Sequence, residues 1–129
     1  MTGAEMEALI ARVEAATGPD RELDEAIEKV VIPSVKDLTR AEGGRFHPVY
    51  GRVSEPAFYT ASLDAAASLV PSGWQWEIYS NGSALLFVQP PEPWAIRRTA
   101  SALRCATPAL ALCLAVLRAL LPQESDDHV

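Results

Sequence analysis

The sequence predicts an α+β fold, a helix–sheet–helix sandwich in which helices cover both faces of a small antiparallel sheet of two or three strands. Two observations predict it. Apolar residues recur with helical spacing in four segments of the 129-residue chain, as in amphipathic helices. Two segments of strand composition flank Asn81-Gly82, a dipeptide typical of hairpin turns. The predicted order is α-α-α-β-β-(β)-α, in a single domain that covers residues 1–129.

The first two helices are predicted over residues 4–16 and 21–31. The first has one apolar stripe, formed by Met6, Leu9, Ile10 and Val13. The second has Asp20 as its expected N-cap. Its expected buried side consists of Leu23, Ala26, Ile27, Val30 and Val31. Three charged residues of this helix are expected to face water: Glu22, Glu25 and Lys29.

The middle of the chain is the least regular part. Residues 33–59 contain glycine and proline breaks and no sustained periodicity, and the pattern allows one short strand, around residues 48–53. A loop of this length inside a compact domain is either functional or mobile. A third helix is predicted over residues 62–70, capped by Thr60 or Ser62 and ended by a Pro-Ser-Gly sequence.

Two strands are predicted over residues 74–80 and 83–90. One face of the first carries Trp74, Trp76 and Ile78. We interpret the two rings as core packing under a helix, with a stacking platform for a planar ligand or a partner as the alternative. The second strand is apolar on both faces, which is typical of a covered or central strand. Asn81-Gly82 predicts a type I′ turn with positive φ at both positions, and residues 93–101 are a candidate third strand.

The fourth helix is predicted over residues 108–121, with Thr107 as N-cap and Pro108 in its first turn. One stripe consists of Leu110, Leu114, Leu117 and Leu121. Other apolar residues extend this stripe around most of the helix, so it is either a central core helix or half of a subunit interface. The sequence predicts a homo-oligomer through the stripe, and a disordered tail over residues 122–129.

The charge of the chain limits its partners. The net charge is −6, and there is no basic stripe, so neither non-specific nucleic-acid binding nor docking on anionic membranes is expected. The first residues lack the basic and apolar regions of a secretory signal. The most apolar run is too short to span a membrane and contains a proline and an arginine. We therefore expect a cytoplasmic protein with reduced cysteines.

The sequence has no catalytic or metal-binding pattern. Cys113 lies within the apolar fourth helix, where it is expected to pack as a small hydrophobe. Cys105 precedes that helix, whose dipole can lower a thiol pKa, but no histidine is near it in the sequence. His47 and His128 have no ligand partners at helical or turn spacing. The sequence predicts no catalytic residues, no metal and no cofactor, and therefore a protein that is not an enzyme.

Arginine and aromatic residues supply the candidate binding site. A guanidinium fork binds phosphate and an aromatic ring stacks on a base, so together they favour an anionic, nucleotide-like small molecule. The candidate residues are Arg45, Phe46, Tyr50, Arg52, Trp94, Arg97, Arg98 and Arg104. Free N–H groups at the start of the fourth helix would add to such a site. The alternative interpretation is a scattered, solvated surface.

Three stretches of the sequence resemble a known family. They are "TGPDRELDEAI", "YTASLDAAASLVPSGWQW" and "ATPALALCLAVLRAL". In this order they resemble the phage ABA sandwich domain family, small proteins encoded by phages and prophages. The resemblance implies a helix–sheet–helix fold and a phage or prophage origin, but no activity and no site residues. One stretch departs from it: "PPEPWAIRRTASALRC" is basic and proline-rich where the family leads us to expect a shorter third strand.

The functional hypothesis combines these observations. We expect a small non-enzymatic binding protein in the cytoplasm of a bacterial host, with an anionic small molecule or a host protein as its partner. In counter-defence, such a protein would sequester a nucleotide-derived immune signal or block a host protein. The alternative is a structural, assembly or protein-interaction module of a phage.

Overall fold

The computed structural model describes residues 3–35, 37–88, 94 and 98–121. The helices are α1 (Gly3–Ala15), α2 (Arg21–Val31), α3 (Leu63–Ala67) and α4 (Pro108–Leu120), and a 3₁₀ turn, Pro33–Val35, follows α2. The strands are β1 (Thr39–Ala41), β2 (Gly44–His47), β3 (Gly51–Val53), β4 (Gln75–Ile78), β5 (Ala84–Val88) and β6 (Arg98–Ala102). The predicted α+β class is confirmed, because the described residues form four α-helices and two antiparallel three-stranded sheets. The predicted tail, residues 122–129, lies outside the described residues.

The strands of the second half of the chain form a sheet of order β4-β5-β6. Strand β5 is central, with Leu86 opposite Trp76 of β4 on one side and Ala100 of β6 on the other. Because this strand is apolar on both faces, the sequence predicts that it is either covered or central, and the structure shows it in the central position. The candidate third strand is confirmed as β6, which begins at Arg98. Residues 89–93 and 95–97 lie outside the described part.

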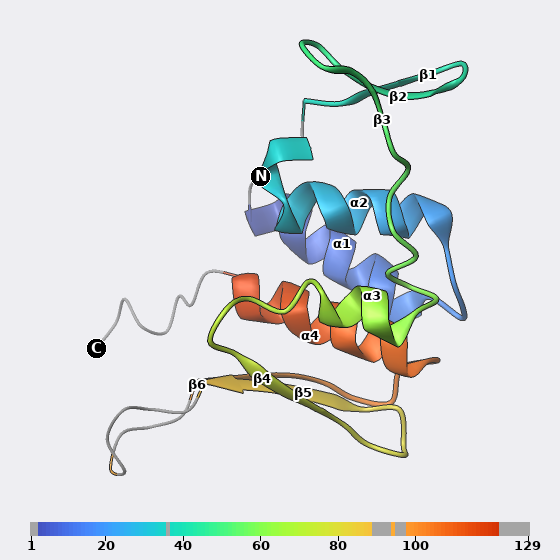
Figure 1. Cartoon of the computed structure of the whole chain (residues 1–129). Coiled ribbons are helices and arrows are strands. Elements are labelled where there is room, and N and C mark those ends of the chain that lie inside the picture. The colour runs from blue at the N-terminus through green and yellow to red at the C-terminus, as the bar shows by residue number, and fades with distance from the viewer. Residues whose placement is uncertain (1–2, 36, 89–93, 95–97, 122–129) are drawn as a thin grey trace.

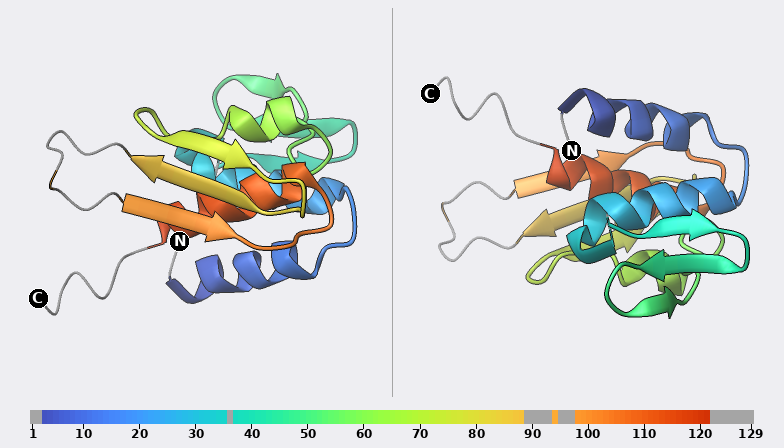
Figure 2. Two further views of the ribbon diagram at one scale, coloured as in Figure 1. Left: turned by 90° about the horizontal axis from the view of Figure 1, so that it is seen from below. Right: turned by 90° about the horizontal axis from the view of Figure 1, so that it is seen from above.

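Helix α4 is the middle layer of the molecule (Figure 1; Figure 2). The β4–β6 sheet covers one side of it, and α1, α2 and α3 pack against it from the other sides. The four helices therefore lie on the same side of this sheet, which differs from the predicted sandwich with helices on both faces. The reason lies in α4 itself. Its surface is apolar nearly all round, so it needs cover on every side, and a sheet below it with helices above it provides that cover.

The apolar residues of α4 form the core of a single chain. Leu110, Leu114 and Leu117 are at most 1% exposed, and Leu121 is partly buried against the same core. These are the leucines through which the sequence predicts contact between subunits. Because the first three are covered by the chain's own sheet and helices, they offer no surface to a second copy. The sequence allowed α4 to be either a central core helix or half of a subunit interface, and the structure shows a central core helix.

Helices α2 and α4 begin at the predicted residues, whereas α1 begins one residue earlier and α3 one residue later than predicted. Helix α3 is also shorter than the predicted 62–70, because it ends at Ala67. The Asp20 carboxylate accepts hydrogen bonds from two backbone N–H groups of the first turn of α2, at 2.9 and 3.2 Å. Thr107 Oγ1 accepts one from the first turn of α4 at 3.1 Å. Of the two candidate caps of α3, Ser62 accepts a backbone N–H at 3.2 Å. Thr60 has a different role, because its side chain binds α2.

The turn between β4 and β5 corrects a prediction. Gly82 has a φ of 85°, but Asn81 does not have positive φ, so the turn is not type I′. Gly82 N–H donates to Tyr79 C=O at 3.1 Å, and Tyr79 N–H donates to Ser83 C=O at 2.9 Å. This is the pattern of a three-residue loop, a type I turn followed by a glycine bulge. The Asn81 side chain instead accepts the N–H of Ser83 at 3.1 Å.

The two tryptophans of the first predicted strand have different surroundings. Trp74 packs against the core, and the guanidinium of Arg98 lies 5.3 Å from the centre of its ring. Trp76 is exposed, because β4 is an edge strand of its sheet. The core interpretation is therefore correct for Trp74 and wrong for Trp76.

The segment predicted to be irregular contains a second sheet, of order β1-β2-β3. Its strands have only three or four residues, too few to show a two-residue periodicity. The sequence allowed one strand near residues 48–53, where β3 lies, and missed β1 and β2. Gly43, with a φ of 94°, lies in the first turn, and Gly51, with a φ of 78°, begins β3 directly after the second turn. Figure 1 shows this sheet above α2, at the opposite end of the molecule from β4–β6.

Candidate functional site

Helix α2 has a buried polar side next to its apolar stripe. Asp24 is 1% exposed and Glu28 is 7% exposed. They lie one helical turn apart, so both point to the same side of the helix. Their hydrogen-bond partners come from β2, from residues 59–60 and, for Asp24, from Arg21 of the same helix. Buried carboxylates are stable only when they are paired and hydrogen-bonded, and both of these are.

Asp24 holds the chain that follows the small sheet. Its Oδ1 accepts hydrogen bonds from the Thr60 N–H at 2.8 Å and from the Thr60 hydroxyl at 2.7 Å. Its Oδ2 accepts one from Arg21 Nη1 at 2.8 Å. Arg21 also donates to the Pro56 carbonyl at 2.7 Å and lies 4.0 Å from the centre of the Phe58 ring. Residues 56–60 are therefore tied to the start of α2.

Glu28 holds the small sheet itself. Arg45 of β2 donates from Nη1 to Glu28 Oε1 at 2.7 Å, and the Tyr59 hydroxyl donates to the other oxygen at 3.2 Å. Arg45 Nε donates to the Ser54 carbonyl at 3.1 Å. Burial, and next the charge of Glu28, raises the pKa of Tyr59 to about 12. Within the described residues, every buried side-chain nitrogen and oxygen has a hydrogen-bond partner.

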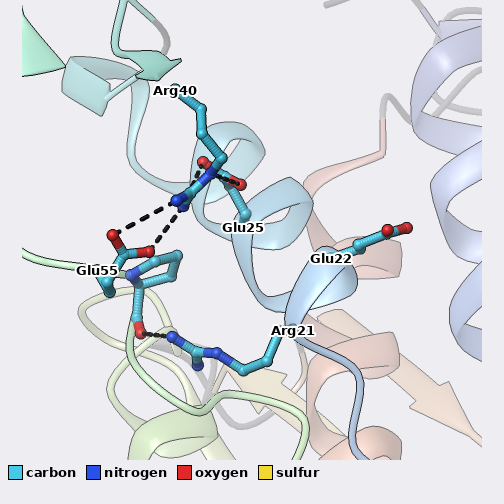
Figure 3. A pocket seen from close by; sticks show the side chains of 6 residues that line it. Arg21, Glu22, Glu25, Arg40 and Glu55 are labelled. Atoms are coloured by element: carbon cyan, nitrogen blue, oxygen red, sulfur yellow. Dashed lines mark hydrogen bonds and ion pairs between the residues drawn. The ribbon is translucent and has the colours of Figure 1, made fainter. Parts of the chain in front are cut away.

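Arg40 of β1 joins two further carboxylates (Figure 3). Its Nε and Nη2 each donate to one oxygen of Glu25, which lies in α2, at 3.2 Å. Its Nη2 also donates to Glu55 at 2.7 Å, and Nη1 to the second oxygen of Glu55 at 3.4 Å. The hydrogen bonds from Arg40 hold the pKa of Glu55 below its ordinary value, and those to Glu55 and Glu25 raise the pKa of Arg40.

An open pocket of about 250 Å³ lies at this junction (Figure 3). Its lining consists of Arg21, Glu22, Glu25, Arg40, Glu55 and Pro56. Three carboxylates and two guanidinium groups border it, and both guanidinium groups already bind oxygens of the chain. The pocket therefore presents no guanidinium fork to an anionic ligand.

Five charged side chains connect the small sheet to α2, and we call them the clamp: Glu25, Glu28, Arg40, Arg45 and Glu55. Within residues 39–53, all of which are described, Arg45 is the only buried residue. We call residues 39–53 the β1–β3 unit. Because its one buried side chain is an arginine, polar contacts rather than apolar burial hold the unit in place.

The turn between β2 and β3, residues 48–50, forms an exposed tip together with the strand residues on either side of it, and we call residues 47–51 the tip. Val49 is 76% exposed and Tyr50 is 81% exposed. His47 Nδ1 accepts the backbone N–H of both residues, at 3.0 and 3.2 Å, and its ring centre lies 4.6 Å from that of Tyr50. The imidazole therefore orders the backbone that carries two large exposed side chains.

The structure divides the arginine and aromatic residues singled out in the sequence. Arg45, Phe46, Tyr50 and Arg52 belong to the β1–β3 unit. Phe46 pairs with Arg52 across the strands; Arg45, the residue before Phe46, points to the other face of the sheet, where it binds Glu28. The second group belongs to β6 and to the sequence around it: Arg98 begins β6, Arg104 follows this strand and Trp94 precedes it in the sequence. Arg97 lies outside the described residues.

The second group has contacts of its own. Arg98 stacks on Trp74. Arg104 has a φ of 52°, and its N–H donates to Ser83 Oγ at 3.1 Å. Because the two sheets lie at opposite ends of the molecule (Figure 1), the described candidate residues do not form one anion site.

Neither cysteine has the surroundings of a nucleophile. Cys113 is fully buried and its thiol contacts the Tyr59 carbonyl at 3.3 Å. Burial raises the pKa of Cys113 to about 12 and also raises the pKa of Cys105, opposite to what a reactive thiolate needs. In the described ranges, no three His, Cys, Asp or Glu side chains are grouped to hold a metal ion.

Sequence reasoning missed the clamp and its neighbours, and of the clamp residues it singled out only Arg45, as a candidate ligand for an anion. Glu25 was expected to face water, and Asp24, Glu28, Arg40, Glu55, Tyr59 and Thr60 were not singled out as contacts. The sequence contains only a partial signal. Asp24 and Glu28, spaced i, i+4 beside the apolar stripe of α2, indicate a polar face, and arginines recur in residues 33–59, but nothing in the sequence pairs these acids with these arginines.

Comparisons with known proteins identify no relative of this chain. No family model, no curated protein and no solved structure matches it. Among the described residues, no helix has the length and apolar character that crossing a membrane requires.

Proposed function

We propose that this protein is a non-catalytic binding protein and that the tip, residues 47–51, is its contact with a partner protein. The observation that carries the proposal is the exposure of Val49 and Tyr50 on a turn that His47 already orders. Tyrosine is among the residues that contribute most at protein interfaces. A turn that is ordered before binding loses less conformational entropy on association.

The arginines support a protein partner rather than an anionic small molecule. Sequestering a nucleotide-derived signal would require guanidinium groups that face a shared pocket. Arg45 instead binds Glu28, and Arg40 binds Glu25 and Glu55. The pairing of these arginines within the chain leaves the tip as the more promising contact.

The resemblance to phage proteins bears on the identity of the partner. On that basis we propose a bacterial host protein that is blocked by binding, as in counter-defence. A role in phage assembly is the alternative, and it would use the same tip against another phage protein. The raised pKa values of Cys105 and Cys113 support a role without nucleophilic catalysis.

The experiment compares the proteins captured from a bacterial lysate by the wild-type chain and by Tyr50→Ala. Trp94→Ala is the matched control, because Trp94 is aromatic and 82% exposed but lies between β5 and β6 in the sequence, outside the tip. A partner that is lost with Tyr50→Ala and retained with Trp94→Ala would support the proposal, once circular dichroism shows both variants folded.

Two results would count against it. Equal capture by wild type and Tyr50→Ala would remove the tip from the interface. A nucleotide-sized mass retained by the wild-type protein in native mass spectrometry would favour binding of an anionic small molecule over binding of a protein partner. Captured phage proteins in lysates of infected cells would favour assembly.

A further inference from the structure

The hydrophobic core bypasses the β1–β3 unit. Among the described residues, the buried core residues and the apolar side chains packed against them lie before residue 32 or after residue 58. Leu38 and Pro56, just outside the two ends of the unit, are buried. The unit therefore gains little of the free energy that apolar burial contributes to folding, and its two flanks are fixed more firmly than the unit itself.

The clamp contains a buried ion pair and an exposed set of ion pairs, joined by a longer contact between Arg45 Nη1 and Glu25 Oε2 at 3.9 Å. Arg45 and Glu28 are both buried. Arg40, Glu25 and Glu55 are partly or largely exposed, so salt screens their attraction. Exposed pairs of this kind are weak individually.

Arg40 occupies the central position in the exposed set. It lies on β1, Glu25 lies on α2, and Glu55 lies on the segment after β3. One guanidinium therefore joins the unit, the helix and the returning chain, as Figure 3 shows. Weakening this single group loosens all three connections at once.

We propose that the β1–β3 unit is a latched element, which opens from α2 as one body when the ion pairs of the clamp weaken, while the helices and the β4–β6 sheet stay folded. Elements with few buried apolar contacts are the ones that open locally in native proteins. Opening uncovers Glu25 and Glu28 on α2 and changes how the tip is presented. The effect of opening on the presentation of the tip rests on the proposed function of the tip.

The test is hydrogen exchange of the full-length protein, read by mass spectrometry in about 0.05 M and about 0.5 M NaCl, concentrations between which the screening length falls severalfold. We expect amides of residues 39–53 to exchange about tenfold faster at the higher salt concentration, and those of α4 and β5 to be unchanged. Glu55→Gln and Glu25→Gln should give the fast exchange at low salt already. Glu22→Gln is the matched control, because Glu22 lines the same pocket but is not part of the clamp.

Three outcomes would overturn the latch. Residues 39–53 could be protected as strongly as β5, exchange could be independent of salt and of both substitutions, or exchange could be complete at low salt, so that no closed state exists. If Glu25→Gln prevents folding, Glu55→Gln still tests the latch, because Glu55 is exposed and its substitution leaves the core intact. No partner is present in this experiment, so its failure is separate from failure of the proposed function.

Discussion

Arg45 Nη1 lies 2.7 Å from Glu28 Oε1, and both side chains are buried. The two residues are 17 positions apart in the chain, one in β2 and one in α2. Removing two charges from water is unfavourable, and a buried pair is stable only when further hydrogen bonds satisfy both groups. Tyr59 does this for Glu28, and the Ser54 carbonyl does it for Arg45.

Arg45→Met tests this pair. Breaking a pair that is buried in a core costs about 3–5 kcal/mol. The latch limits the cost, because an open unit lets water reach Glu28. We therefore expect a loss of about 1–3 kcal/mol in the free energy of unfolding, measured in urea. A loss of about 5 kcal/mol with cooperative unfolding of the whole chain would show that the unit is an integral part of the core.

Gly82→Ala should be more destabilising than Gly73→Ala. Both glycines have positive φ, 85° and 88°, which costs an L-residue about 1–2 kcal/mol. At Gly82 a Cβ would also lie 2.6 Å from the Cys105 carbonyl oxygen, whereas at Gly73 it would meet nothing within 4 Å. We expect Gly82→Ala to lose at least about 1 kcal/mol more in urea unfolding. Equal losses would mean that the hairpin and Cys105 are not in contact.

Alkaline pH should destabilise the fold from about pH 9 upward. Burial raises the pKa of Cys113 from 9.0 to about 12 and that of Tyr59 from 10.0 to about 12. The folded state therefore keeps protons that the unfolded chain releases. The contribution of the two neutral groups is complete below pH 9 and is lost as the pH rises through about 12.

Urea midpoints at pH 8, 10 and 11 measure this loss. The midpoint should fall steadily over the series, and Cys113→Ala should make the fall smaller, because only Tyr59 and the partly buried Cys105 then remain of the groups with raised pKa values. A wild-type midpoint that does not change up to pH 11 would contradict the burial of both groups.

Leu114→Asp should unfold the protein. Leu114 is 1% exposed in the core, so the substitution buries an unpaired charge, at a cost of more than about 4 kcal/mol. Leu120→Asp is the control on the same helix, because Leu120 is exposed. Circular dichroism and size-exclusion chromatography would follow both variants. A folded Leu114→Asp monomer from a larger wild-type assembly would instead indicate a subunit interface.

Local chemistry made much of the fold predictable. Asp20 and Thr107 cap their helices because a short oxygen-bearing side chain before an apolar run satisfies free N–H groups whatever the rest of the chain does. The Asn81-Gly82 hairpin was also predictable, but its turn type was not. Both the type I′ turn and the glycine-bulge loop accept glycine with positive φ, and only the pairing of Tyr79 with Ser83 distinguishes them.

The clamp was not predictable, because its partners are distant in the sequence. Glutamate on a helix is usually solvated, so the spacing of Glu25 and Glu28 alone does not reveal burial. The burial of Glu28 and the pairing of Glu25 depend on Arg45 and Arg40, which reach α2 only after strands of three or four residues have paired. Strands that short have no periodicity to read.

The sequence by itself determined the α+β class, the starts of the helices to within one residue, the caps of α2 and α4, the hairpin of β4 and β5 and the apolar character of α4. These follow from apolar periodicity and from hydrogen bonds within a few residues. The packing decided that α4 is a core helix. Only the tertiary structure decided that the helices lie on one side of the β4–β6 sheet, that the middle segment is a second sheet, and that Arg45 meets Glu28. These depend on which surfaces remain to be covered and which charges remain to be paired once the elements have packed, and pairing over long distances leaves no local pattern.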